Sequence, residues 1–220
     1  QEQRVVSLLR LNELVLRSSA YKTLEKQVLL LEPLMMQLVE VNQLEEALEI
    51  TKQMPLPQSR DHLQLTLVHA LITQGRSSDA YRIAENIKGS KPNAQAHLAL
   101  AKVWAQEERF DDALLTLKKS KSASEADLLY SELASEFALS TLTNRAVLAL
   151  ESIEPKTRRD QCLSAYAVAL SKASQTMKAR SMITKINAKK EKQLTEAAIL
   201  QSLIATQKFT EALQFVDGES

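Results

Sequence analysis

The sequence predicts an all-α protein, specifically an α-solenoid of about six helix–turn–helix repeats. Three observations support this fold class. Leu, Ala, Glu, Lys and Gln dominate the 220 residues, whereas there are only 3 Gly and 5 Pro, a composition that favours helix because these side chains lose little rotamer freedom in one. A similar segment recurs at a fixed interval along the chain. Within each copy the apolar residues are spaced three or four apart, which places them on one helical face.

The recurrence is clearest in one short segment of each copy. "GRSSDAYRIAENI" is matched by "NQLEEALEITKQM", "ERFDDALLTLKKS", "TLTNRAVLALESI", "SQTMKARSMITKI" and "QKFTEALQFVDGE". Each contains an alanine at the same position, with an interval of thirty-three throughout: Ala47, Ala80, Ala113, Ala146, Ala179 and Ala212. A small residue at a fixed position indicates that two helices approach closely there, and we expect a larger side chain to overpack the contact.

Two further columns of apolar residues keep this register. Thirteen residues before each alanine stand Leu34, Leu67, Leu100, Leu133, Tyr166 and Ile199. Nine residues before it stand Leu38, Leu71, Trp104, Phe137, Leu170 and Leu203. Each repeat is therefore predicted to consist of two amphipathic helices joined by a short turn. One such pair cannot bury its apolar face alone, so we expect successive pairs to stack and share a continuous core.

The expected elements follow in chain order. Residues 1–25 contain an amphipathic helix at 4–17, which we interpret as the remainder of an earlier repeat. The repeats are expected at 26–55, 58–89, 91–121, 122–155, 156–188 and 189–218. Pro33 lies where the first helix of the first repeat should already be running, so we expect that helix to start or kink there.

Helix-breaking residues agree with this division. Gly75 is expected in the turn inside the second repeat, and Gly218 after the last helix. Other breakers are expected between repeats: Pro55, Pro57, Gly89, Pro92 and Pro155. Ser122 and Glu125 form a candidate capping box for the helix that follows them.

These columns resemble the tetratricopeptide repeat. That family combines apolar and small residues in the first helix with a Gly five before a near-invariant Ala in the second, as in Leu67, Leu71, Gly75 and Ala80. The resemblance covers roughly residues 26–218. The chain departs from the family in its period, which is one residue shorter, in the missing proline near the end of each repeat, and in having the internal Gly once. The resemblance implies a right-handed superhelix whose first helices line a concave groove.

Family members of this kind are mostly scaffolds that bind peptides or helices of other proteins. When the groove positions of the family are carried over to this sequence, the residues that would line the partner-binding groove are His62, Leu65, His69, Gln95, Leu98, Lys102, Leu128, Ser131 and Ser135. The Lys/Asn clamp that some members use for a C-terminal carboxylate is missing, so we do not expect a binder of chaperone tails. The predicted function is a non-catalytic scaffold for protein–protein interaction.

No residue pattern points to chemistry. His62 and His69 are seven apart on the same face, whereas a metal pair on a helix prefers three or four. Cys162 lies near Arg158 and Arg159, so a lowered thiol pKa is one interpretation and a packed, inert cysteine the other. Paired acids at Glu45–Glu46 and Asp111–Asp112 fall at starts of second helices, where they complement the helix dipole. We therefore expect no enzyme, no cofactor and no metal.

Charge is uneven along the chain. Residues 155–192 carry ten Lys or Arg against two acids, although the whole chain is at +1. The candidate basic patch comprises Lys156, Arg158, Arg159, Lys178, Arg180, Lys185, Lys189, Lys190 and Lys192. An acidic protein segment is the partner we expect there. Nucleic acid is the alternative, although the stretch has only Tyr166 to stack against bases.

Three expectations concern the chain as a whole. Its one cysteine excludes an internal disulfide, and no apolar run is long enough for a membrane span. With no signal-peptide pattern at the start, we expect a cytoplasmic protein that is a piece of a longer chain. The last helix carries Phe209, Leu213, Phe215 and Val216, so a homodimer through the terminal repeat is a further hypothesis.

Overall fold

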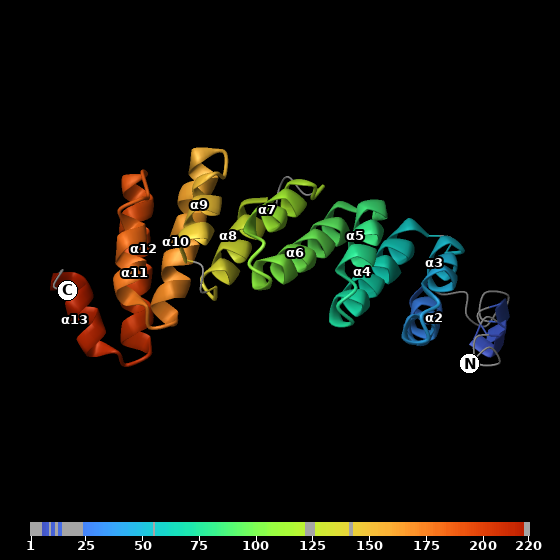
Figure 1. Cartoon of the computed structure of the whole chain (residues 1–220). Coiled ribbons are helices and arrows are strands. Elements are labelled where there is room, and N and C mark those ends of the chain that lie inside the picture. The colour runs from blue at the N-terminus through green and yellow to red at the C-terminus, as the bar shows by residue number, and fades with distance from the viewer. Residues whose placement is uncertain are drawn as a thin grey trace. The chain divides into compact units, whose positions relative to one another are not determined.

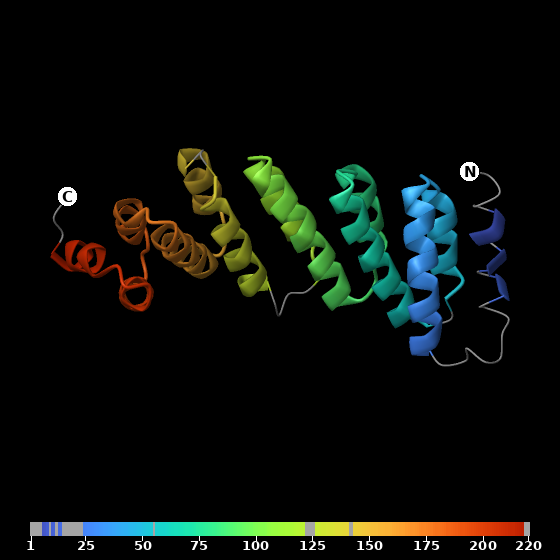
Figure 2. The same cartoon turned by 90° about the horizontal axis from the view of Figure 1, so that it is seen from below.

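The computed structural model describes residues 6–8, 10–11, 13–14, 24–54, 56–121, 126–140 and 143–217. Every regular element in these residues is an α-helix, so the all-α fold class is confirmed for the described part of the chain (Figure 1). Figure 2 shows the same helices from below. None of the described helices is both long and apolar enough to cross a membrane.

Longer helices alternate with shorter ones along the chain. The longer helices are α2 (Leu24–Glu40), α4 (Pro57–Thr73), α6 (Ser90–Gln106), α8 (Ala126–Phe137), α10 (Lys156–Lys172) and α12 (Lys189–Ala205). The shorter helices are α3 (Leu44–Lys52), α5 (Ser77–Asn86), α7 (Phe110–Lys118), α9 (Thr143–Glu151), α11 (Thr176–Ile183) and α13 (Phe209–Asp217). Successive shorter helices begin at a constant interval of thirty-three, which is the interval of the sequence pattern.

The chain forms two compact parts, which are described separately. The N-terminal part comprises Gln1–Leu100 with Lys119–Ser122, and the C-terminal part comprises Ala101–Lys118 with Ala123–Ser220. In the N-terminal part, α2 packs on α3 and α4, and α4 packs on α5. In the C-terminal part, α10 packs on α8, α11 and α12. Each longer helix thus contacts both its own shorter helix and the next longer one where both lie in one part.

The recurring alanines are buried as the register predicts. Ala47, Ala80, Ala113, Ala146 and Ala179 are 0% exposed, and Ala212 is 8% exposed. The column nine residues before them is also buried in most copies, the exception being Trp104, which is half-buried. Helical residues near the N-terminus also contribute to the core, because Leu8 is buried in the same cluster as Leu31 and Met35.

The turns between longer and shorter helices share one backbone geometry. In each described copy the turn residue has a positive φ between 59° and 72°: Asn42, Gly75, Glu108, Ser174 and Gln207. The residue after it donates its N–H to a carbonyl five residues earlier, for example from Arg76 to Leu71 at 2.8 Å and from Lys208 to Leu203 at 2.9 Å. This is the Schellman pattern that satisfies the free carbonyls at a helix end. The helix–helix angle is therefore set by a repeated hydrogen bond and not by glycine alone.

The prolines differ from the sequence expectations at three positions. Pro33 lies inside α2, which begins at Leu24, so a helix start at Pro33 is wrong, whereas the alternative of a kink there stays a prediction. The carbonyl that loses its donor belongs to Leu29, whose side chain is 73% exposed, and water can take the donor's place there. Pro57 and Pro92 lie within the first turns of α4 and α6, not between helices. First-turn N–H groups have no helical partner, so proline removes no helical hydrogen bond at these positions.

Only some of the other expected helix-breaking residues lie in the described part of the chain. Pro155 precedes α10 as its N-cap residue, as expected for a residue between repeats. Gly89 likewise lies just before α6. Pro55, Ser122, Glu125 and Gly218 lie outside the described residues.

Two buried carboxylates tie one longer helix to the start of the next. Asp61 on α4 accepts the backbone N–H groups of Lys88 and Gly89 at 3.0 and 2.6 Å, immediately before α6. Asp160 on α10 accepts those of Asn187 and Ala188 at 3.2 and 2.9 Å, immediately before α12. Both carboxylates are 4% exposed. Because their oxygens are used to cap the following helix, their burial has a structural cause.

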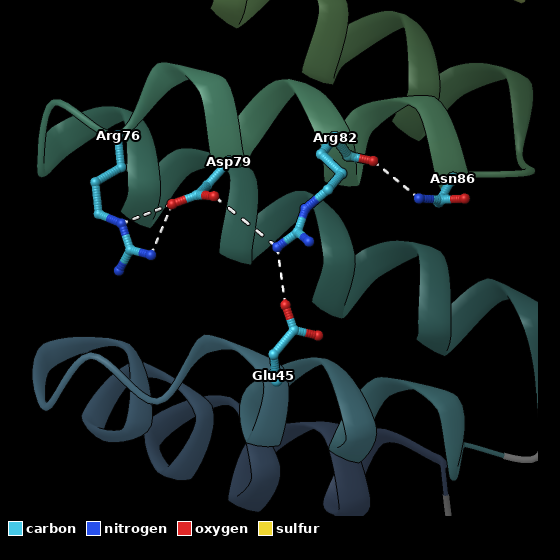
Figure 3. Close-up of polar contacts among 5 residues, drawn as sticks. All are labelled: Glu45, Arg76, Asp79, Arg82 and Asn86. Atoms are coloured by element: carbon cyan, nitrogen blue, oxygen red, sulfur yellow. Dashed lines mark hydrogen bonds and ion pairs between the residues drawn. The ribbon is translucent and has the colours of Figure 1, made fainter.

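Exposed ion pairs join adjacent shorter helices. Arg82 on α5 reaches Glu45 on α3 at 2.9 Å, and Asp79 bonds Arg76 at 2.7 Å (Figure 3). Asn86 extends the row by donating to the carbonyl of Arg82 at 2.8 Å. More than half of the Arg82 and Glu45 side-chain surfaces remain in water, so this pair is worth about 0.2–1 kcal/mol.

The turn geometry makes a prediction for Gln207. Its φ of 59° is strained for any residue with a Cβ, and its side chain is exposed. We expect Gln207→Gly to raise the free energy of unfolding by about 1 kcal/mol, which is about 2–4 °C in melting temperature for a chain of this size. Thermal unfolding followed by circular dichroism measures this.

Gly75 provides the matched control for this prediction. A Cβ added there would meet no atom within 4 Å, so only the positive φ of 72° opposes a side chain. Gly75→Ala should therefore lower the melting temperature by a similar amount. If Gln207→Gly destabilises the protein, the positive φ is not what limits the stability of this turn.

Candidate functional site

The predicted groove residues of the N-terminal part lie on α4 and α6. His62, His69 and Gln95 are exposed. Leu65 and Leu98 are half-buried, and Leu65 packs against the core of this part. The two histidines are thus accessible to a partner, whereas Leu65 uses part of its surface for the fold.

The remaining predicted groove residues belong to the C-terminal part. Lys102 near the end of α6 forms an ion pair with Glu132 on α8 at 3.2 Å, so its charge is already engaged. Leu128 is 62% exposed although it is apolar. Ser131 and Ser135 are half-buried, and the Ser135 hydroxyl donates to the Ser131 carbonyl at 3.1 Å.

A cleft of about 360 Å³ brings some of these residues together with others. It lies among three successive longer helices, α8, α10 and α12. Its lining is formed by Asp127, Leu128, Ser131, Gln161, Ser164, Ala165 and Glu191. Of the predicted groove residues of the C-terminal part, Leu128 and Ser131 line it, whereas Lys102 and Ser135 do not.

The sequence already contained a signal for the second wall of this cleft. Gln161 and Ser164 stand one interval of the repeat after Leu128 and Ser131, so they occupy the same two positions in the next repeat. Asp127, Ala165 and Glu191 fall outside those positions, and only the structure identifies them. Ser164 is held in place because the hydroxyl of Thr195 on α12 donates to it at 2.8 Å.

The candidate basic patch is divided among several elements. Lys156, Arg158 and Arg159 lie at the start of α10, and Lys189, Lys190 and Lys192 at the start of α12. Lys178 and Arg180 lie on α11, and Lys185 follows it.

Several of these cations already have acidic partners. Arg158 pairs with Asp127 at 2.6 Å and lies 5.1 Å from the centre of the Tyr130 ring. Lys185 pairs with Glu151 at 2.6 Å. Arg158 and Lys185 therefore serve contacts between neighbouring helix pairs, and the charge left for a ligand is smaller than the sequence indicates.

Arg180 lines a second cleft, of about 430 Å³, with apolar and acidic neighbours. Ile183, Leu200, Phe215 and Val216 form its apolar walls, and Thr184 and Glu196 complete the lining. The Nη1 atom of Arg180 is buried and has no hydrogen-bond partner among the described residues. Among the described residues that line this cleft, Arg180 is thus the one cation, and most of the others are apolar.

Cys162 is a packing residue. Its side chain is fully buried on α10, and burial raises the pKa of the thiol to about 12. The interpretation of an activated thiol is therefore wrong, because the loss of solvation outweighs the attraction of Arg158 for the thiolate.

His97 on α6 differs from His62 and His69 in being removed from solvent. It is 1% exposed, and its ring lies 6.2 Å from that of Tyr81, edge to face. Burial lowers the pKa of His97 to about 4; Glu85 opposes this change, and Lys119 and Lys121 add to it. Lys119 in turn bonds both Glu85, at 3.0 Å, and the Tyr81 hydroxyl. The imidazole is therefore neutral and part of the core near neutral pH.

Comparison of the chain with protein-family models, with curated proteins and with solved structures finds no significant match in any of the three.

The burial of His97 predicts a pH-dependent stability. The folded protein holds a neutral imidazole down to about pH 4, whereas the unfolded chain binds a proton at its ordinary pKa of 6.5. Protons therefore favour unfolding as pH falls from 6.5 toward 4. We expect a loss of about 2–3 kcal/mol over this window and no contribution from His97 above it. Urea unfolding at a series of pH values measures this.

His97→Leu serves as the comparison, because it removes the titrating group and keeps an apolar neighbour for Tyr81. The difference in unfolding free energy between the two proteins should change between pH 6.5 and 4 and stay constant above pH 7. A constant difference at all pH values would show that His97 protonates as easily in the folded state as in the unfolded one.

Proposed function

We propose that this protein is a non-catalytic scaffold that binds a peptide or helix of another protein in a groove lined by its longer helices. In this proposal the helix pairs stack as a tetratricopeptide-like α-solenoid with six repeats. The observation that carries it is the cleft among α8, α10 and α12. Its walls come from the same two repeat positions on successive longer helices, Leu128 with Gln161 and Ser131 with Ser164.

The lining of this cleft suits a helical or extended protein segment. Leu128 offers an apolar contact that is 62% exposed in the free protein. Ser131, Ser164 and Ala165 are small, so a backbone can approach the helices closely. Gln161 supplies both a donor and an acceptor for peptide groups. An apolar anchor surrounded by small and polar residues is the usual composition of a peptide-binding groove.

The charges around the cleft favour a protein over nucleic acid. Asp127 and Glu191 both line it, and Arg158 is paired with Asp127 at 2.6 Å. Carboxylates repel phosphate groups, so the cleft itself is a poor nucleic-acid site. The nucleic-acid alternative then depends on the lysines at the starts of α10 and α12.

The solenoid arrangement predicts an extended particle in solution. A compact domain of 220 residues would have a radius of gyration of about 17 Å. Stacked helix pairs form an elongated array, so we expect a clearly larger value in small-angle X-ray scattering at low protein concentration. A radius of gyration no larger than that of a compact domain would mean that the helix pairs pack into one globule. The groove proposed here requires stacked pairs, so that result would contradict the proposal.

The groove predicts a specific loss of binding in Leu128→Arg. A photo-crosslinking side chain placed at Gln161 should capture a partner protein from native extract, and that partner is then purified. We expect Leu128→Arg to weaken its binding at least about tenfold, because a buried apolar contact is replaced by a desolvated charge. Isothermal titration calorimetry measures the affinity.

Leu148→Arg is the matched control, because Leu148 on α9 is also apolar and 66% exposed but does not line the cleft. It should bind as the unchanged protein does. If both variants lose affinity for the partner equally, the partner does not bind in the cleft, and the proposed groove is wrong. If binding instead disappears with nuclease treatment and with charge reversal at Lys156, Lys189 and Lys190, the partner is a nucleic acid.

A further inference from the structure

The cleft among α8, α10 and α12 is acidic, although the sequence around it is basic. Its ionisable lining residues are Asp127 and Glu191, and no Lys or Arg is among the described residues that line it. Both α10 and α12 nevertheless begin with an exposed lysine, Lys156 and Lys189. The charge that a bound segment meets inside the cleft is therefore opposite in sign to the charge of this stretch of sequence.

The surface that contains the cleft is open in several repeats. The equivalents of Leu128 in the two preceding repeats, Gln95 and His62, are exposed, and so is Gln161 in the following repeat. Each of the four longer helices that carry these residues is followed by a further helix pair. The packing of one helix pair on the next therefore leaves this position uncovered.

Only one of the two carboxylates in the cleft is neutralised within the chain. Asp127 accepts from Nε of Arg158 at 2.6 Å, and the guanidinium also lies 5.1 Å from the centre of the Tyr130 ring. Glu191 is half-buried, and its backbone carbonyl accepts from the Thr195 hydroxyl at 2.7 Å. The Glu191 carboxylate forms no hydrogen bond or ion pair with a described residue. The open negative charge of the cleft is thus that of Glu191.

The repeat register explains why Glu191 has no acidic-to-basic contact like that of Asp127. Glu191 stands one interval after Arg158, and Asp160 stands one interval after Asp127. The attractive pair between α8 and α10 is therefore replaced by two acids between α10 and α12. Because buried Asp160 caps the start of α12, its charge stays in place, and Glu191 cannot form with it the contact that Arg158 forms with Asp127.

The position of Glu191 within α12 also separates it from the neighbouring lysines. Lys190 and Lys192 adjoin it in the sequence, but adjacent residues on a helix point about 100° apart and do not face each other. The residues three and four positions later, Leu194 and Thr195, carry no charge. An acid in the first turn complements the helix dipole, yet the first turn of α10 contains none. The dipole therefore does not require an acid at this position.

We propose that Glu191 is a specificity-determining residue of this cleft and selects a protein segment that carries a lysine or arginine. This inference rests on the function proposed above, in which the cleft binds a segment of another protein. An apolar side chain of that segment packs on Leu128, and its cation donates to the Glu191 carboxylate, with the side-chain oxygen of Gln161 as a further acceptor. A basic segment is thereby favoured over a neutral one, and an acidic segment is repelled.

A random peptide library selected on the whole chain tests the charge of the bound segment. Peptides are kept where Leu128→Arg weakens their binding at least about tenfold, because that loss assigns them to the cleft. We expect the kept peptides to be enriched in Lys and Arg. Selection on the Glu191→Lys protein should remove this enrichment, because a cation in the peptide is then repelled.

A double-mutant cycle measures the charge contact itself. One kept peptide is synthesised twice, with its lysine or arginine and with glutamine in that place, and both affinities are measured by isothermal titration calorimetry. Glu191→Gln should weaken binding of the basic peptide about fivefold or more, and that of the glutamine peptide less than about twofold. A general distortion of the cleft would weaken both peptides alike.

Glu196→Gln is the matched control variant. Glu196 also lies on α12 and is exposed, but it does not line this cleft. The variant removes the same charge from the same helix, so its affinity for the basic peptide should stay within about twofold of the unchanged protein. Equal weakening by Glu191→Gln and Glu196→Gln would mean that the net charge of the protein attracts the peptide, and the selective role of Glu191 would be wrong.

The outcomes separate this inference from the proposed function. Peptides that depend on Leu128 but show neither enrichment in Lys and Arg nor coupling to Glu191 would overturn the selectivity and leave the groove intact. If no selected peptide depends on Leu128, the groove itself is wrong. Sedimentation of the chain alone tests a second copy as the occupant. A dimer that both Leu128→Arg and Glu191→Lys abolish would assign the cleft to self-association and overturn the proposal of a partner segment.

Discussion

The constraint on which this structure depends is that no helix pair can cover its own apolar surface. The shorter helices have 8 to 10 residues, which is too few for a stable helix in isolation. A shorter helix gains its stability by packing on other helices, as α11 does on α10, α12 and α13. The interval between shorter helices is kept without a slip because an insertion in one pair would rotate its apolar face away from the next.

The turns and the caps repeat with the same interval because they fix the angles at which these faces meet. A Schellman hydrogen bond closes each described turn between a longer and a shorter helix, whether the residue of positive φ is Gly75, Glu108 or Gln207. Buried Asp61 and Asp160 cap the helix that begins the following pair. These two carboxylates are thus buried where the backbone needs a hydrogen-bond partner.

Since these contacts occupy the core, the scaffold function proposed above would use the surfaces that the packing of helix pairs leaves open. The cleft among α8, α10 and α12 is one of these surfaces. Its lining consists of small and polar residues with one large apolar residue, Leu128.

The helices, their interval and the buried alanines could be predicted from the order of amino acids, because helical periodicity is a local property that six copies repeat. The resemblance to the tetratricopeptide repeat implied Leu128 and Ser131 as groove residues, and both line a cleft in the structure. Four other outcomes required the three-dimensional packing: Asp127 and Glu191 join that cleft, Glu132 engages Lys102, burial holds His97 neutral, and Cys162 is inert. They depend on distances between side chains about one repeat apart and on their access to water, which spacing along one helix does not specify.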